Sequence, residues 1–242
     1  MLKHTILVAA VAGLVLALAG TAQASAIIVP ITAITGSHGG DYYGNGMISL
    51  IDGSGMTRPD VSDPSTWSCS ETSYNQTLMS DFLVAALNSK LAWVALDLGA
   101  TTNVKELYLW NIRYQNGPAG TQTYNLYYAN SPTVSLPAQP GKATYSTTGL
   151  TPQGDYDFSS GGWTQFNTSG VLTLGKTADD VVDIRGIPSA RYLALEILTN
   201  YGDNYQGGRV GFNELAVAIP EPATMALLGL GGLGVLLRRK RR

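Results

Sequence analysis

The sequence is poor in the residues that most often act as nucleophiles or bases. It has one cysteine, Cys69, and two histidines, His4 and His38, in 242 residues. A single cysteine cannot form a disulfide within the chain, so the thiol either lies in the packing or bridges two molecules. Because His4 lies in a leader described below, a Ser-His-Asp triad or a cysteine nucleophile would depend on His38 alone. We therefore predict that the protein is not an enzyme.

Charge is also scarce, and its balance is acidic. Charged residues make up 13% of the chain. Six of the 15 basic residues and one of the 17 acidic residues lie outside residues 25–219. Residues 25–219 therefore contain nine basic and sixteen acidic residues, and their net charge is −7. A nucleic acid partner is not expected for a surface of this sign.

A hydrolase is the alternative that the acidic residues leave open. Glycoside hydrolysis uses a pair of carboxylates. The acidic residues lie in polar stretches, where a charge is usually solvated, so we rank hydrolysis below binding. The candidates are Asp155, Asp157, Asp179, Asp180 and Asp183.

The N-terminus has the pattern of a secretory signal peptide. Lys3 and His4 precede an apolar run over residues 5–19, and the small residues Ala22-Gln23-Ala24 follow it. An Ala-x-Ala sequence after such a run is a signal-peptidase site, so we predict that residues 1–24 are removed and that the mature chain begins at Ser25. Residues 25–219 are then one domain, long enough to bury a core.

The C-terminus has the pattern of a short membrane segment. An uncharged run, residues 223–237, follows Pro220-Glu221-Pro222 and precedes five consecutive cations. Such cations keep the end of a membrane helix on the cytoplasmic side. A helix of about 15 residues rises about 22 Å, against about 30 Å for a hydrocarbon core, so it would span only where the bilayer thins. The cations are Arg238, Arg239, Lys240, Arg241 and Arg242.

This tail, residues 220–242, resembles the PEP-CTERM sorting signal of exopolysaccharide-producing Gram-negative bacteria, also called the ice-binding-protein C-terminal motif. The resemblance implies recognition by an exosortase, a transpeptidase-like membrane enzyme, and cleavage near Pro220-Glu221-Pro222. The expected route is export across the inner membrane, transient membrane anchoring, and then a place on the cell surface or outside the cell. The alternative is an ordinary C-terminal membrane anchor.

Between the two ends, the apolar residues follow the period of strands. Asn-Gly, Asp-Gly and Gly-Gly clusters separate these stretches and supply the turns that connect antiparallel strands, so we predict an all-β sandwich. A helix is expected only over 78–90, where apolar residues recur at helical spacing, and long loops are expected over 131–162. The predicted strands span residues 27–35, 92–98, 104–111, 123–129, 162–166, 191–198 and 209–218.

Five pieces of this region follow one another in a recognisable order. They are residues 50–56, 93–99 with Asp97-Leu98-Gly99, 104–111, 190–197 and 210–215. Together they resemble a discoidin (F5/8 type C) domain of the galactose-binding-like class. The resemblance implies an antiparallel jelly-roll sandwich. Residues 131–162 depart from the family pattern, and no family ligand loop is recognisable.

Residues 52–57 are the best candidate for a metal loop. Calcium prefers six to eight oxygen ligands, and Asp52, Ser54 and Thr57 offer oxygens in a glycine-rich loop. The discoidin resemblance implies a structural calcium here, closed by Glu214 from the far end of the domain. The alternative is that Asp52-Gly53 is simply a turn. Arg191 and Glu214 each lie at the edge of an apolar strand, and we expect both to bridge parts of the structure.

Aromatic residues in the loops are the candidate sugar-binding residues. Aromatic rings stack on pyranose faces, while carboxylates and amides bind the hydroxyls. The alternative for any one ring is that it caps an end of the sandwich. The candidates are Tyr42, Tyr43, Trp67, Trp163, Tyr201, Asp203 and Tyr205. We predict an exported protein that binds extracellular polysaccharide or cell-surface glycan, with a structural envelope or biofilm matrix protein as the alternative.

Overall fold

The computed structural model describes residues 27–37, 47–53, 55–69, 93–111, 120–137, 156–173, 180–202 and 210–220, with the backbone alone at 168 and 169. All of these belong to one compact unit, Ile27–Pro220. The regular elements in these ranges are strands and two short 3-10 helices, and none of the helices described is long and apolar enough to cross a membrane. The predicted helices at 78–90 and 223–237 lie outside the described residues.

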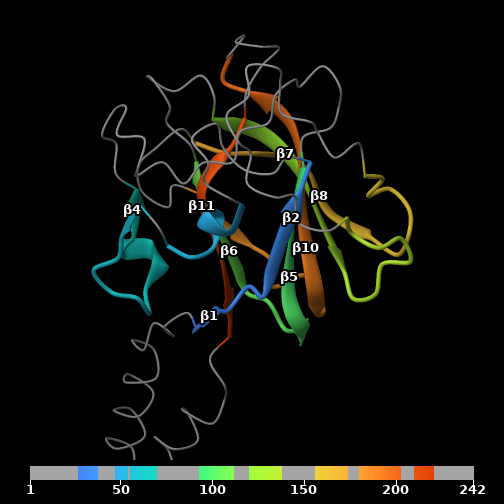
Figure 1. Ribbon diagram of the computed structural model, residues 1–242, viewed down its shortest axis with the longest axis horizontal. Coiled ribbons are helices and arrows are strands. Elements are labelled where there is room, and N and C mark those ends of the chain that lie inside the picture. Colours follow the sequence, from blue (N-terminus) through green and yellow to red (C-terminus); the bar gives the residue numbers. More distant parts are fainter. Residues whose placement is uncertain are drawn as a thin grey trace, which may run out of the picture. The chain divides into compact units, whose positions relative to one another are not determined.

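Two antiparallel sheets make up the body of this unit (Figure 1). One has the strand order β1-β11-β6-β9 and the other the order β2-β5-β10-β7-β8, and neighbouring strands in each pair are antiparallel. The predicted antiparallel jelly-roll sandwich is confirmed. The first sheet contains β1 (Ile27–Val29), β11 (Phe212–Ile219), β6 (Glu106–Asn111) and β9 (Asp180–Asp183). The second contains β2 (Ala33–Gly36), β5 (Trp93–Thr102), β10 (Ala190–Asn200), β7 (Thr121–Ala129) and β8 (Thr164–Val171).

Short elements surround the two large sheets. The 3-10 helices are η1 (Met47–Leu50) and η2 (Pro64–Thr66), and β3 (Met56–Thr57) pairs with β4 (Ser68–Cys69). The predicted strand over 27–35 is wrong, because the chain divides at Pro30, which has no N–H to donate to a ladder. The part before Pro30 joins one sheet as β1, and the part after it joins the other as β2.

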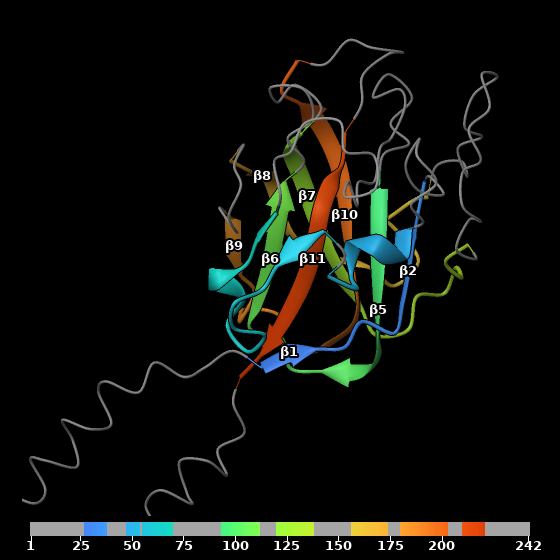
Figure 2. The same cartoon turned by 60° about the vertical axis from the view of Figure 1, so that its left-hand side comes forward.

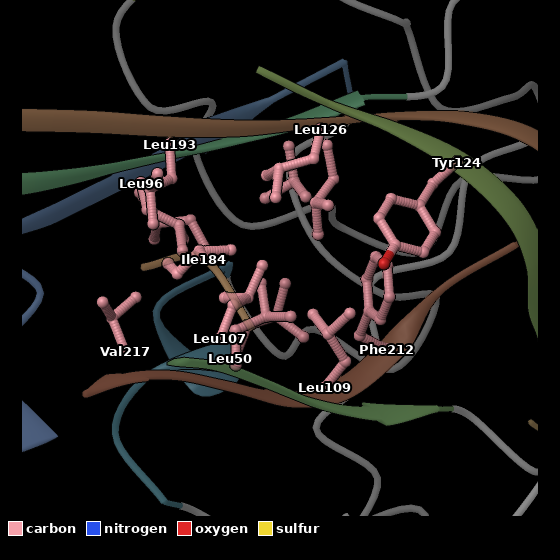
Figure 3. Packing of buried hydrophobic residues seen from close by; sticks show 14 of the residues in the cluster. Leu50, Leu96, Leu107, Leu109, Tyr124, Leu126, Ile184, Leu193, Phe212 and Val217 are labelled. Carbon is pink, nitrogen blue, oxygen red and sulfur yellow. The ribbon is translucent and has the colours of Figure 1, made fainter. Parts of the chain in front are cut away.

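The two sheets enclose one hydrophobic core (Figure 3). Leu96, Leu126 and Leu193 enter it from the five-stranded sheet, and Leu107 and Leu109 enter it from the four-stranded sheet. None of these side chains is more than 2% exposed. The burial of each leucine contributes roughly 1.5–3 kcal/mol to stability.

Part of the outer face of the five-stranded sheet is apolar as well, and this part is covered. Trp93 and Tyr127 on this face pack against Tyr156, Phe158 and Trp163, and the rings of Tyr127 and Phe158 stack with centroids 5.3 Å apart. Together with Leu136, which packs against them, these residues form a second hydrophobic cluster. The described parts of the predicted loops over 131–162 have no regular secondary structure, as expected. They also cover the sheet, which would otherwise expose a tryptophan and a tyrosine to water.

Buried polar residues join the two sheets at one end of the sandwich, which we call the loop end. Thr121 at the start of β7 donates its N–H to Asn111 Oδ1 at 2.9 Å, and Asn111 at the end of β6 donates from Nδ2 to the Thr121 carbonyl at 2.6 Å. Thr121 Oγ1 also donates to the Gly211 carbonyl at 3.1 Å, just before β11. From there β11 runs to the opposite end, where Ile219 pairs with Ile27 of β1 (Figure 2).

One glycine in β5 allows a close approach between neighbouring strands. Gly99 has a φ of 78°, and an added Cβ would lie 2.8 Å from Thr32 Cγ2. Thr32 cannot easily turn away, because its hydroxyl donates to the Asp97 carbonyl at 2.9 Å. A left-handed backbone costs a residue with a Cβ about 1–2 kcal/mol.

We expect Gly99→Ala to lower the unfolding free energy by more than this amount, since it also displaces Thr32. Gly202→Ala is the matched control, because Gly202 has a φ of 99° but nothing within 4 Å of an added Cβ. Denaturant unfolding followed by circular dichroism measures both variants. Equal losses would show that the contact with Thr32 is unimportant.

Candidate functional site

The predicted sugar-binding loops are described only in part. Tyr42, Tyr43, Asp203 and Tyr205 lie outside the described residues. Tyr201 follows β10 at the loop end and is half-buried, and its hydroxyl donates to the carbonyl of Leu172. Burial raises the pKa of this hydroxyl, so it stays protonated as a donor at neutral pH.

The two predicted ligand tryptophans, Trp67 and Trp163, are buried in the packing. Trp67 is 4% exposed, its ring stacks on Trp110 with centroids 5.5 Å apart, and the Arg58 guanidinium lies 5.2 Å from its centroid. Trp163 is 8% exposed and meets Phe158 edge-to-face at 5.0 Å. Neither ring offers an open face to a sugar, because each covers the outer face of a sheet. Their predicted role in stacking on ligand is therefore corrected to packing.

Glu214 on β11 lies against the loop that contains Asp52. The N–H of Gly53 donates to Glu214 Oε1 at 3.1 Å, and Glu214 is only 2% exposed. Within the described residues, Glu214 Oε2 is buried without a hydrogen-bond partner. Asp52 and Thr57 are exposed, and Ser54 lies outside the described part of the chain. The expectation that Glu214 bridges distant parts of the structure is confirmed.

The charges around Glu214 bear on whether an ion fits there. Burial is the main cause that raises the pKa of Glu214 to about 8, and the nearby charge of Asp52 adds to it, while the Gly53 N–H and Arg58 oppose it. A buried carboxylate oxygen without a partner, beside a second carboxylate, is a donor set that a hard cation accepts. Among the described residues, no group of three or more His, Cys, Asp or Glu side chains gathers around one point.

A pocket of about 410 Å³ lies on the outer face of the five-stranded sheet. The small side chains of Ala33 on β2 and Ala95 on β5 line it, together with residues 130–132 and 135–137. Thr35 Oγ1 donates to the Pro137 carbonyl at 3.0 Å and so ties this segment to β2. The pocket was not predicted from the sequence, since no local pattern shows which strands 131–137 covers.

An ion pair lines the same pocket. Arg191 donates from Nε to Asp97 Oδ1 and from Nη2 to Asp97 Oδ2, both at 3.0 Å, and its guanidinium lies 4.8 Å from the ring centroid of Tyr192. A register shift between Ala190 and Tyr192 lets the successive residues Arg191 and Tyr192 line one pocket. Burial opposes the ionisation of Asp97, but the bonds from Arg191 and Gly99 outweigh it and hold its pKa below the ordinary value. The expectation that Arg191 bridges parts of the structure is confirmed.

The comparisons with known proteins decide the nature of the tail. Residues 218–242 match the family model of the PEP-CTERM protein-sorting motif. The chain carries this sorting motif. The C-terminal signal predicted from the sequence is confirmed, and the match begins with the last two residues of β11. No curated protein sequence matches the chain.

Several solved structures are similar to this chain. An F5/8 type C domain from Bacteroides fragilis aligns with a TM-score of 0.46 and 12% identity, covering 82% of this chain and 99% of that one. The family 32 CBM of NanJ from C. perfringens, in complex with galactose, gives 0.43 and 14%, covering 80% and 98%. Chitosan-binding module 1 of a chitosanase/glucanase from Paenibacillus sp. IK-5 gives 0.42 and 17%, covering 80% and 98%. The predicted F5/8 type C resemblance is thus also found among solved structures.

The raised pKa of Glu214 predicts a pH dependence of stability when calcium is chelated. The folded state keeps a proton on Glu214 up to about pH 8, whereas the unfolded state loses it near the ordinary glutamate pKa of 4.5. The unfolded state then binds fewer protons between these values, so the unfolding free energy should fall as the pH rises from 4.5 to about 8 and level off above that.

Thermal unfolding across this pH range, in chelator, measures the effect. Glu214→Gln cannot ionise and still offers an oxygen to the Gly53 N–H, so its unfolding free energy should lose this downward slope. An equally steep fall in the variant would show that Glu214 is not the titrating group.

Proposed function

We propose that this is an exported, non-enzymatic surface protein that binds glycan and is sorted by an exosortase through its C-terminal motif. The pocket on the outer face of the five-stranded sheet carries the proposal. The sorting motif supports the location, because a protein exported by this route meets extracellular polysaccharide and cell-surface sugars. Signal peptidase would act on the other end of the chain.

The chemistry of the pocket suits a sugar. Its volume of about 410 Å³ lies within the roughly 300–1,000 Å³ of small-ligand sites. Ala33, Ala95 and Leu136 give it apolar walls that complement the C–H groups of a pyranose ring. The guanidinium of Arg191 and the hydroxyl of Ser131 offer hydrogen bonds to sugar hydroxyls.

The loop end is the second surface that we propose for glycan contact. Tyr201 lies there with a half-buried ring. A polysaccharide chain is long enough to use more than one surface of a domain, so contacts at the loop end and in the pocket are compatible. The other residues proposed for this surface are Tyr42, Tyr43, Asp203 and Tyr205.

A glycan array tests the proposal. The full-length chain, held in nanodiscs and labelled, is expected to bind a subset of the glycans reversibly and to leave them uncleaved. A preparation that has been unfolded by heat is the control for non-specific adhesion. If the folded protein binds no glycan on a broad array, the proposal fails, and self-association of the chain would then favour a structural role in the envelope or biofilm matrix.

We also propose that a structural calcium binds between the loop of Asp52 and the buried Glu214. Oxygens of Ser54 and Thr57 are the further ligands proposed from the sequence. The support is the buried Glu214 Oε2, which has no hydrogen-bond partner among the described residues. The ion would supply a positive charge that lets Glu214 ionise while buried.

Calcium is then expected to raise the melting temperature of the protein. At free calcium about a hundred times the dissociation constant, the folded state gains about 2.7 kcal/mol. Asp52→Asn and Glu214→Gln should each reduce this gain. Asp157→Asn removes the same charge from an exposed site and should leave the gain unchanged. No change in melting temperature with calcium in the wild type would contradict the proposed ion.

A further inference from the structure

We propose that the pocket between Ala33, Leu136 and Arg191 selects an uncharged sugar residue over a carboxylated one. This inference rests on the proposed glycan binding, and it names the class of ligand for one site. The pocket lies on the outer face of the five-stranded sheet, away from the loop end where Tyr201 lies. Ligand binding in the pocket can therefore be tested separately from the role of Tyr201.

The charge balance of the pocket favours a neutral ligand. Asp97 and Arg191 are the charged residues in its described lining, and they form a two-pronged ion pair with both bonds at 3.0 Å. The N–H of Gly99 donates to Asp97 Oδ1 at 2.8 Å and holds the carboxylate in place. The Arg191 side chain is 41% exposed, so a ligand carboxylate would lose only part of its hydration. It would still compete with Asp97 for a guanidinium that is already neutralised. A sugar with hydroxyl groups only has no charge to desolvate.

Arg191 can still donate to an uncharged ligand. A guanidinium carries five N–H bonds in a fixed plane, and Asp97 accepts two of them. Two residues hold the guanidinium in place. Asp97 accepts from its edge, and the ring of Tyr192 lies against its face, with the ring centroid 4.8 Å from Arg191 Cζ. Because the ion pair and the ring hold the guanidinium, little side-chain freedom is lost when it donates to a hydroxyl.

The wall opposite the sheet is also held in place. Tyr156 donates its hydroxyl to the Val134 carbonyl at 2.5 Å, and the N–H of Thr133 donates to the Gly161 carbonyl at 2.7 Å. With the bond from Thr35 to Pro137, the segment 131–137 is tied to β2 and to residues 156–161. The pocket is therefore preformed, and its width depends on the small side chains beneath this wall.

Matched pairs of sugars test the selectivity. The probes are the methyl glycosides of glucose, galactose and mannose, each with its 6-carboxylate, titrated by calorimetry into the full-length chain in nanodiscs. We expect at least one neutral glycoside to bind ten times more tightly than its own carboxylate. A carboxylate that binds more tightly than its neutral partner would overturn the proposal.

A variant with a larger side chain in the pocket tests whether the sugar binds there. Ala33 is exposed on an edge strand, so Ala33→Leu should narrow the pocket while leaving the core intact, and we expect it to weaken binding of the neutral glycoside tenfold or more. Ala100→Leu makes the same change at an exposed alanine outside the pocket lining and should bind as the wild type does. Equal binding by both variants would place the sugar elsewhere and overturn this inference, although glycan binding itself would stand.

A charge variant tests the reason for the selectivity. Asp97→Asn leaves the Arg191 charge without its partner, so the preference for the neutral sugar should shrink and the 6-carboxylate should bind more tightly than it does to the wild type. An unchanged preference in a variant that still melts cooperatively would show that the ion pair does not set the selectivity. If no sugar binds to the wild type in either assay, both the inference and the proposed function fail.

Discussion

Both sheets of this domain carry buried aromatic residues on their outer faces as well, and much of the remaining structure follows from that. Two sheets packed face to face bury only their inner surfaces. Trp93 and Tyr127 on one outer face, and Tyr108 and Trp110 on the other, would stay in water without further layers. Chain segments from the loops supply those layers. The pocket forms at the edge of the layer that covers the five-stranded sheet, where the sheet presents the alanines Ala33 and Ala95 instead of aromatic residues.

The strands were the most predictable part of the fold. The alternation of apolar and polar residues and the glycine-rich turn sequences both depend on local backbone geometry. The central strands β5, β6, β7 and β10 could therefore be predicted with approximate bounds. The division at Pro30 could have been predicted from its missing N–H. The short edge strand β9 has two adjacent valines between Asp180 and Asp183, a run too short to show the alternation of a strand. Its pairing with β6 depends on tertiary contacts that no window of sequence contains.

The candidate site was less predictable, for a physical reason. Trp67 follows a proline and two hydroxyl residues, and Trp163 follows two glycines, so both have the local sequence of exposed turns. Their burial depends on which sheet face each turn covers, and that is decided by distant residues. The role of Arg191 was easier to predict, because a charged residue in an apolar strand needs a partner wherever the strand lies. Asp97 could not be assigned as that partner without the pairing of β10 with β5.

The pairing of β1 with β11 has a mechanical consequence. Ile27 and Ile219 are partners, so a tether that continues from Pro220 pulls on a strand whose far end lies at the opposite pole of the sandwich. The eight residues of β11 extend over roughly 26 Å and lie between β1 and β6. A pull along this strand loads its ladder bonds in shear, so that many must break together. If the domain is held elsewhere while its tail is pulled, β11 is therefore the strand that resists the force.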